Sequence, residues 1–157
     1  MKQIIHIWEQ PKIIEHSTLL AWCYKHWTNK DLIPDLENTT DLARKMYEAP
    51  FVIVSHGTEP DPVFNYANKK AQELWQLTWE EFICLPSRKS AEPMEENLRN
   101  SLIEVGKKKG ISFIDKAIRV SKCGHRFYIK NVTLFNLFLP ANTFAGQGAI
   151  YADWEFL

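Results

Sequence analysis

Apolar residues in the first third of the chain recur with the spacing of amphipathic helices. Ile13, Leu20 and Trp27 lie on one face of such a helix, since they follow the i, i+3, i+4, i+7 pattern. A second, shorter helix is predicted after Asn38, whose side chain is suited to cap the first turn of TTDLARKMY. Both patterns together predict a helical extension over residues 1–49.

Strand patterns begin where this extension ends. The β-branched run FVIVSHG and the run VFNYAN, separated by the turn EPDP, predict an antiparallel hairpin. Helical spacing returns over residues 69–75. Thr78 and Glu81 then have the spacing of a capping box, at which another short helix begins. Short helices therefore follow the hairpin.

The next part of the chain combines a long helix with a second hairpin. Met94, Leu98, Leu102 and Val105 form an apolar stripe, and the helix is expected to end at KKKG. Two runs rich in Ile, Val, Phe, Tyr and Thr follow and are joined at SKCG, where Gly124 is expected to supply a positive φ.

The last run, GAIYADWEFL, alternates and is predicted to be a single strand. Ile150, Ala152 and Trp154 are expected on its covered face, and Tyr151 on the opposite, partly wet face. The order of helices and strands predicts an α+β fold, in which helices pack on one face of a five-stranded antiparallel sheet.

Composition restricts the class of protein. The chain has 157 residues, 45% of them hydrophobic, which suits one globular domain. Nineteen basic residues balance nineteen acidic ones, so nucleic acid is not expected as a partner. No apolar run reaches the roughly 18 residues of a membrane helix, and no signal-peptide core begins the chain, so no membrane association is expected. Three widely spaced cysteines favour neither a disulfide framework nor a zinc site, and a cytoplasmic location is expected.

Sequence blocks in the second part of the chain resemble a known family. VFNYANKKAQELW resembles the stretch of PAS domains in which a strand ends in Asn before an Ala-x-x-Leu helix, here Asn68, Ala71 and Leu74. LPSRKSAEP, followed by GHRFYIKNVTLFNLF and GQGAIYADW, is similar to the MEKHLA domain, a PAS-related module. This resemblance divides the chain into a helical extension over 1–49 and a PAS-like MEKHLA domain over 50–157, within one folding unit.

The resemblance implies a sensory or protein-interaction module rather than an enzyme. PAS relatives hold haem, flavin or small metabolites between sheet and helices, or hold nothing and dimerise, so no cofactor is singled out. A homodimer is expected, with the N-terminal helices and their residues Trp8, Trp22 and Trp27 at the interface. Two alternatives remain open: a ligand-free dimerisation scaffold, and an enzyme on a related cone-shaped α+β fold with a pair of titratable residues deep in its pocket.

Covalent flavin photochemistry is not expected. PAS-type photosensors carry a reactive cysteine in an Asn-Cys-Arg-Phe motif, and EEFICLPSRK places Ser87 at the cysteine and Arg88 at the arginine. Serine cannot form the flavin adduct. Cys84 lies three residues too early and is interpreted as a small core residue. Noncovalent flavin stays possible.

The histidines single out no haem site. His16 and His26 are expected to be surface polar residues, whereas His56 and His125 adjoin turn glycines and are expected to be solvated. The chain contains no G-x-S-x-G, P-loop or H-E-x-x-H motif. We therefore expect a protein that is not an enzyme.

Several polar residues within the MEKHLA-like blocks are candidates for binding a small-molecule ligand. Each also has a structural explanation: an amide side chain can cap a helix or bond a strand backbone, and an arginine can pair with an acid of the chain. The candidates are Asn68, Ser87, Arg88, Arg126, Asn136 and Gln147. The expected ligand site is a small aromatic-lined cavity between sheet and helices, whose filling shifts the N-terminal helices.

Overall fold

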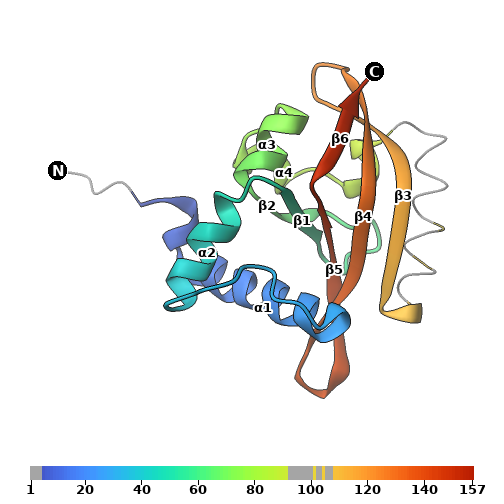
Figure 1. Cartoon of the computed structure of the whole chain (residues 1–157). Helices are drawn as coiled ribbons and strands as arrows, with labels where there is room; N and C mark the ends of the chain where they lie inside the picture. The colour runs from blue at the N-terminus through green and yellow to red at the C-terminus, as the bar shows by residue number, and fades with distance from the viewer. Residues whose placement is uncertain (1–4, 92–100, 102–103, 105–107) are drawn as a thin grey trace.

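The computed structural model describes residues 5–91, 101, 104 and 108–157. Its centre is an antiparallel sheet of six strands in the order β2-β1-β5-β4-β3, with β6 paired to β4 (Figure 1). The strands are β1 (Val52–His56), β2 (Phe64–Ala67), β3 (Ile111–Val120), β4 (Arg126–Leu139), β5 (Thr143–Tyr151) and β6 (Asp153–Phe156). The predicted α+β fold with a five-stranded antiparallel sheet is confirmed, because β5 and β6 lie end to end along β4 and occupy one position in the sheet.

Helices cover both faces of this sheet. The long helix α1 and the shorter α2 pack on one face, and α3 and α4 lie towards the other (Figure 1). Three short 3₁₀ turns complete the described elements. The bounds are η1 (Ile7–Glu9), α1 (Pro11–Thr28), α2 (Thr39–Tyr47), α3 (Lys69–Trp75), α4 (Trp79–Phe82), η2 (Ser87–Ser90) and η3 (Pro140–Asn142). The predicted long helix with Met94, Leu98, Leu102 and Val105 lies outside the described residues.

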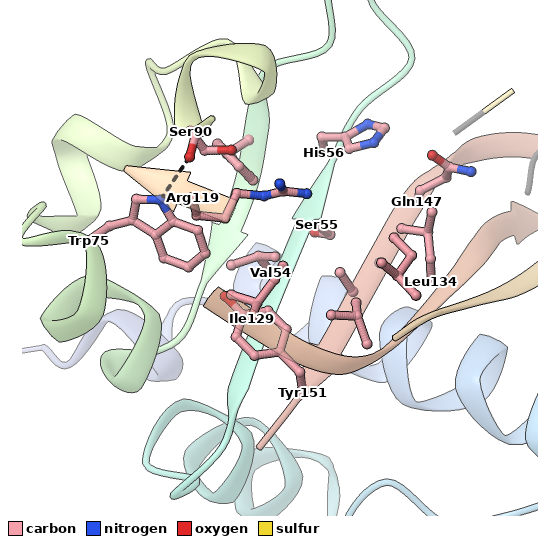
Figure 2. Close-up of a pocket in the computed structure, with 15 residues that line it drawn as sticks. Val54, Ser55, His56, Trp75, Ser90, Arg119, Ile129, Leu134, Gln147 and Tyr151 are labelled. Carbon is pink, nitrogen blue, oxygen red and sulfur yellow. Dashed lines mark hydrogen bonds between the residues drawn. The ribbon is translucent and has the colours of Figure 1, made fainter. Parts of the chain in front are cut away.

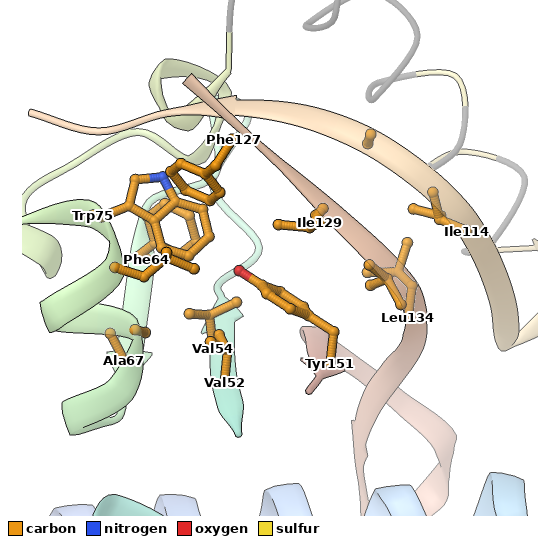
Figure 3. Close-up of a cluster of buried hydrophobic side chains, with 14 of the residues drawn as sticks. Val52, Val54, Phe64, Ala67, Trp75, Ile114, Phe127, Ile129, Leu134 and Tyr151 are labelled. Atoms are coloured by element: carbon orange, nitrogen blue, oxygen red, sulfur yellow. The ribbon is translucent and has the colours of Figure 1, made fainter. Parts of the chain in front are cut away.

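Two hydrophobic clusters, one on each face, hold the layers together. Successive residues of β1 alternate between them: Val52 and Val54 pack with α3 and α4, while Ile53 packs with α1. The cluster beneath α3 contains Trp75, whose ring meets Phe127 edge-on at 5.1 Å (Figure 3). Both faces of the sheet are therefore covered, including the Tyr151 face that was expected to be partly wet.

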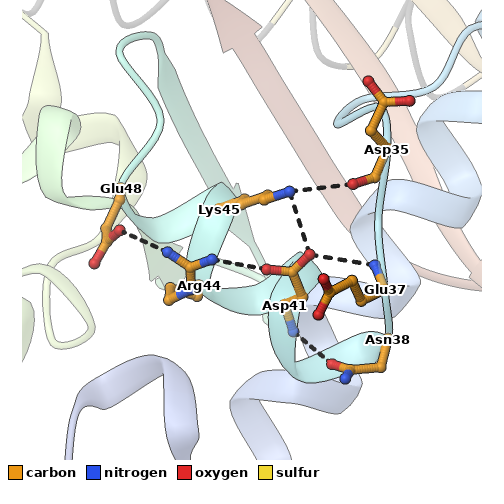
Figure 4. Close-up of polar contacts among 7 residues, drawn as sticks. All are labelled: Asp35, Glu37, Asn38, Asp41, Arg44, Lys45 and Glu48. Atoms are coloured by element: carbon orange, nitrogen blue, oxygen red, sulfur yellow. Dashed lines mark hydrogen bonds and ion pairs between the residues drawn. The ribbon is translucent and has the colours of Figure 1, made fainter.

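The predicted caps are present. The side chain of Asn38 accepts a hydrogen bond from the Asp41 amide at 2.8 Å, at the start of α2 (Figure 4). Asp41 also accepts from the Glu37 amide and pairs with Arg44 and Lys45, and together these contacts lower the pKa of its carboxyl. At α4, Thr78 and Glu81 form the predicted capping box.

The expected alternation of the last strand is wrong. The run GAIYADWEFL breaks at Ala152, so β5 ends at Tyr151 and β6 begins one residue later. Ile150 packs on the α1 face, but Trp154 packs on the α3 face. Because β5 places residues 147, 149 and 151 on the α3 face, Tyr151 is buried in the interior rather than exposed.

In β3 and β4 as well, the residues that face α3 change partway along the strand from one alternating set of positions to the other. In β4 the residues facing α3 are Phe127 and Ile129 before Asn131, but Val132 and Leu134 after it. Asn131 has φ +53°, a left-handed conformation that asparagine adopts more readily than most residues. On the partner strand β3 the buried positions likewise change from even to odd numbers, so Arg119 faces the interior.

Candidate functional site: an interior cavity

A cavity of about 50 Å³ lies inside the fold, between the sheet and the segment that contains α3 and η2 (Figure 2). Strands β1, β3, β4 and β5 form one wall, and Trp75 of α3 and Ser90 of η2 stand opposite. Most of the lining is apolar, with Val54, Ile129 and Leu134 among its residues. The cavity therefore offers a small, largely apolar interior at the centre of the domain.

Polar groups enter this apolar space from different strands. Arg119 of β3 is 6% exposed, and its guanidinium extends between Ser90 and His56 (Figure 2). Its Nη1 donates a hydrogen bond to the Ile118 carbonyl oxygen at 2.7 Å. His56, at the end of β1, is 5% exposed, and its Nδ1 lies 3.0 Å from the Gly57 carbonyl oxygen. Buried polar side chains on several strands thus converge on one cavity.

The Tyr151 hydroxyl is the most deeply enclosed of these groups. It points into the space between Val54, Trp75 and Ile129 (Figure 3). It has no hydrogen-bond partner among the described residues. Burial raises the pKa of Tyr151 well above its ordinary value, and the nearby charge of Arg119 opposes that rise only in part. Tyr151 therefore stays protonated near neutral pH and can donate a hydrogen bond into the cavity.

The wall of the cavity is thin where β1 meets β5. Ser55 and Gly148 are paired across these strands, and both line the cavity. On the opposite face the Ser55 hydroxyl lies 2.8 Å from Nε2 of His16 on α1. A Cβ at position 148 would lie 3.1 Å from Cδ2 of Leu20, so glycine allows α1 to approach the strand. One layer of backbone separates the cavity from α1 at this pair.

His16 has a position that the sequence pattern did not predict. It is half-buried rather than a free surface residue, because α1 docks on the sheet and brings the ring against Ser55 and Tyr66. Desolvation by burial lowers the pKa of His16 to about 4, so it is neutral at physiological pH. The Ser55 hydroxyl in turn contacts Oδ1 of Asn65 at 2.5 Å. This chain of polar contacts ties α1 to β1 and β2.

Among the residues predicted to bind a ligand, Gln147 lines the cavity. It is 1% exposed, and its Nε2 donates to Oδ1 of Asn136 at 3.2 Å. Asn136 lies next to it on β4, and its backbone carbonyl accepts from Trp27 Nε1 at 2.9 Å. The structure therefore brings these two predicted residues together, with Gln147 at the cavity and Asn136 behind it.

Asn68 is enclosed by backbone groups. Its Oδ1 accepts from the amides of Ala71 and Ile53, at 3.2 and 3.1 Å. Its Nδ2 donates to the carbonyls of Met46 and Phe51, at 3.1 and 2.8 Å. These bonds cap α3 and tie it to β1 and α2, which agrees with the capping role considered from the sequence.

The other predicted residues lie away from the cavity lining. Ser87 is buried in η2, where its amide donates to the Pro62 carbonyl at 2.8 Å. Arg88 contacts both carboxylate oxygens of Asp61 through Nε at 3.1 Å, on the surface. Arg126 is exposed at the start of β4. The cavity lining that the structure describes contains none of these three side chains.

Two further expectations from the sequence are wrong. His56 is buried rather than solvated, because the β1–β5 pairing extends to His56 and Gln147 and carries the histidine into the interior. Cys84 is exposed rather than part of the core, because it follows the short helix α4 on the outside of the fold. The buried free cysteine is Cys23, in α1.

Among the described residues there is no cluster of three or more His, Cys, Asp or Glu side chains that could hold a metal ion. Within the same part of the chain, no helix has the length and apolar character needed to cross a membrane.

The arrangement of the sheet, the helices and the interior cavity defines a PAS-like domain, and comparison with solved structures agrees. The PAS domain of a protein from Colwellia psychrerythraea superimposes with a TM-score of 0.61 at 16% identity, over 73% of this chain and 92% of that chain. An RNA-binding light-oxygen-voltage receptor gives a TM-score of 0.63 at 21% identity, over 79% of this chain and 35% of that chain. A light-oxygen-voltage domain described with a flavin analogue gives a TM-score of 0.59 at 14% identity, over 74% and 84%.

The sequence family describes this protein more narrowly than its fold does. A family model for the MEKHLA domain matches residues 14–156, nearly the whole chain, and this protein belongs to that family. No curated protein matches the chain. The family is that of the MEKHLA domain, and the fold is PAS-like.

A flavin does not fit the site. The cavity of about 50 Å³ is roughly a third of the volume of an engineered cavity, about 150 Å³, that binds a single benzene ring, and a flavin carries three fused rings. Ser87, which the sequence comparison predicts at the position of the photosensor cysteine, is not among the described residues of the lining. The ligand must be much smaller than a flavin unless the interior rearranges.

Proposed function

We propose that this protein is a non-enzymatic, cytoplasmic sensory module that binds a small molecule in the interior cavity and communicates its occupancy through α1. The observation that carries this proposal is the Ser55–Gly148 pair, whose residues line the cavity and also contact α1. Membership of the MEKHLA family and the PAS-like fold support a sensory role. We also propose that residues 1–49 and 50–157 fold together as one unit.

The coupling follows from packing on the two faces of the wall. On the α1 face, Leu20 is fully buried in one hydrophobic cluster with Phe135, and a Cβ at position 148 would crowd both side chains. A ligand that displaces β1 or β5 away from the cavity must therefore displace α1, because close-packed interiors transmit strain rather than absorb it. Such a ligand shifts the position of α1 only to the extent that it binds the protein more tightly with α1 displaced than with α1 in its original position.

Xenon offers a test that assumes nothing about the chemistry of the ligand. Apolar cavities bind xenon, and its entry here can be followed by ¹²⁹Xe NMR. We expect xenon pressure to change amide hydrogen exchange in α1 but not in the 121–125 turn, which lies between β3 and β4. Xenon that enters the cavity without changing exchange in α1 would refute the coupling. Xenon that fails to enter would refute the binding site.

We also propose that the module is a homodimer that uses the outer face of α1. Trp22 and Leu139 are 57% and 46% exposed, and they border a groove of about 690 Å³ between α1 and the end of β4. Large exposed apolar side chains gathered in one groove are typical of an interaction surface. Because α1 carries this groove on one side and contacts the cavity wall on the other, a shift of α1 would reach the dimer interface.

Sedimentation equilibrium tests the dimer. We expect twice the mass of the chain for the natural protein and a weaker association for Trp22→Gln. Phe113 on β3 is 70% exposed and pairs with Thr133 of β4, which does not line the groove, so Phe113→Ser is the matched control and should leave the association unchanged. A natural protein that remains monomeric at all concentrations would exclude this arrangement.

The alternative of an enzyme requires a pair of titratable groups that exchange protons within the pocket. His56 and Tyr151 both line the cavity, but the raised pKa of Tyr151 prevents it from acting as a base near neutral pH. The described lining contains no carboxylate. These features support binding rather than turnover.

A further inference from the structure

The Tyr151 hydroxyl is the feature of the cavity that indicates the chemistry of its ligand. We propose that the cavity binds a small neutral molecule with an acceptor oxygen on a short alkyl group, such as a small ketone, and that the Tyr151 hydroxyl donates a hydrogen bond to this oxygen. This inference rests on the proposed function, because it names the ligand class of the same cavity.

The hydroxyl is enclosed together with the cavity. Tyr151 is 3% exposed, and its ring meets that of Trp75 edge-on with the ring centroids 6.4 Å apart. Its hydroxyl points into the space that Val54 and Ile129 also border (Figure 3). It has no hydrogen-bond partner among the described residues. Because native proteins seldom leave a buried hydroxyl without a partner, a ligand oxygen at this point would complete the site.

The hydroxyl acts as a donor. Burial raises the pKa of Tyr151 well above its ordinary value, so the hydroxyl keeps its proton near neutral pH. A protonated phenol donates one hydrogen bond, and a carbonyl oxygen accepts such a bond through either of its lone pairs. In the low dielectric of the interior this bond is electrostatically stronger than it is in water.

The other polar side chains of the lining already have partners within the protein. Polar contacts with other groups of the chain are made by Ser55, His56, Ser90, Arg119 and Gln147. Arg119 has a further interaction besides its bond to a backbone carbonyl, so its charge is not assigned to the ligand. An ion that entered the cavity would exchange its hydration shell for a bond to the neutral Tyr151 hydroxyl, which does not offset the loss of hydration. These contacts favour a neutral ligand.

The volume of the cavity limits the ligand to a few atoms. A water-sized group needs about 10–15 Å³ of cavity volume. The cavity of about 50 Å³ therefore admits about four non-hydrogen atoms, the number in acetone. The apolar side chains of Ile129 and Leu134 border the same space and suit the methyl groups of such a molecule.

Acetone and isobutene form a matched pair of probes, because they share a planar, branched shape and differ only in an oxygen that replaces a methylene group. Titrations of the full chain by ¹³C NMR would measure the affinity of each probe for the natural protein and for Tyr151→Phe. We expect Tyr151→Phe to bind acetone roughly tenfold more weakly, because the ketone oxygen then lacks its donor, and to bind isobutene equally or more tightly. Cross-peaks from the acetone methyl groups to Ile129 and Leu134 would place acetone in the cavity.

Tyr66→Phe is the matched control. Tyr66 is also fully buried, but it packs in the cluster on the α1 face and is not among the described residues of the cavity lining. The control removes the same atom from a buried tyrosine and should leave the acetone affinity unchanged. Without ligand, Tyr151→Phe should melt at the same temperature as the natural protein or higher, because it removes a hydroxyl that lacks a partner.

The outcomes distinguish this inference from the function on which it rests. The ligand class is wrong if acetone gives no cross-peaks to the cavity, or if Tyr151→Phe leaves its affinity unchanged or weakens isobutene by the same factor. Tighter binding of acetate than of acetone would overturn the neutral class. If acetone fails to bind but xenon still enters the cavity and changes exchange in α1, the ligand class is wrong and the sensory function stands. If xenon also fails, both are wrong.

Discussion

Substituting Gly148 by alanine probes the shared wall directly. The added Cβ would lie 2.6 Å from Cζ of Phe135 and 3.1 Å from Cδ2 of Leu20, on the α1 face of β5. Carbon atoms prefer separations of about 3.5–4.0 Å, so the contact with Phe135 is about 1 Å too short. Overpacking of this kind costs about 1–3 kcal/mol. For a domain of this size the melting temperature should fall by about 2–12 °C.

The assay combines thermal unfolding with hydrogen exchange. We expect Gly148→Ala to lower the melting temperature and to increase exchange specifically in α1. Gly124→Ala is the control: its Cβ would meet nothing within 4 Å, but φ +83° makes alanine costly there by about 1–2 kcal/mol. That control should lower stability without a specific change in α1.

A double substitution tests whether the clash is the cause. Phe135→Leu removes the ring atom that lies closest to the new methyl group, so the cost of Gly148→Ala should be smaller in that background than in the natural protein. The reasoning would be refuted if Gly148→Ala melted like the natural protein with unchanged exchange in α1. Full additivity of the two substitutions would also contradict it.

Two further predictions concern polar groups that join the layers. Asn68→Ala leaves four backbone groups, three of them in buried hydrogen bonds, without their side-chain partner and should cost about 3 kcal/mol or more in urea unfolding, against about 1 kcal/mol for the exposed cap in Asn38→Ala. A similar cost for both would contradict this role. For His16, the pKa of about 4 in the folded protein lies below the ordinary histidine value of 6.5, so the unfolded chain binds more protons between these values. The contribution of His16 to the free energy of unfolding should therefore be fully present above pH 6.5 and fall by about 3 kcal/mol as pH drops to 4. In urea titrations, the free energy of unfolding of His16→Gln should depend less on pH than that of the natural protein.

Local features of the fold could be predicted from the sequence because they depend on neighbouring residues. The helix at Ile13 to Trp27, the Asn38 cap and the Thr78 capping box each follow from residues a few positions apart. GQGAIYADW was one of three blocks that together indicated the family, and the structure gives a physical reason for its second glycine: a side chain at position 148 would meet the Phe135 ring and Leu20 of α1. That contact spans the chain and has no local signature.

Two polar residues of the cavity lining were missed for different reasons. In β3 and β4 the inward positions change parity near Asn131, so Arg119 faces the interior although alternation from Ile114 would place it outside. Tyr151 lies opposite Ile150 as alternation predicts, but its face of the sheet is covered by α3 rather than partly wet, so Tyr151 is buried. A positive φ at an asparagine is the one local signal that could have suggested the change of face in β4.

The central claim is that a change inside the cavity is felt by α1 through the Ser55–Gly148 wall, and the Ala149→Val variant tests it most directly. Ala149 lines the cavity on β5, so the substitution adds two methyl groups to the interior without touching α1. A ¹H–¹⁵N correlation spectrum of the variant should show shifted amides at Ser55 and Gly148 and also along residues 16–20 of α1. Shifts confined to the cavity face, with residues 16–20 unchanged, would contradict the account.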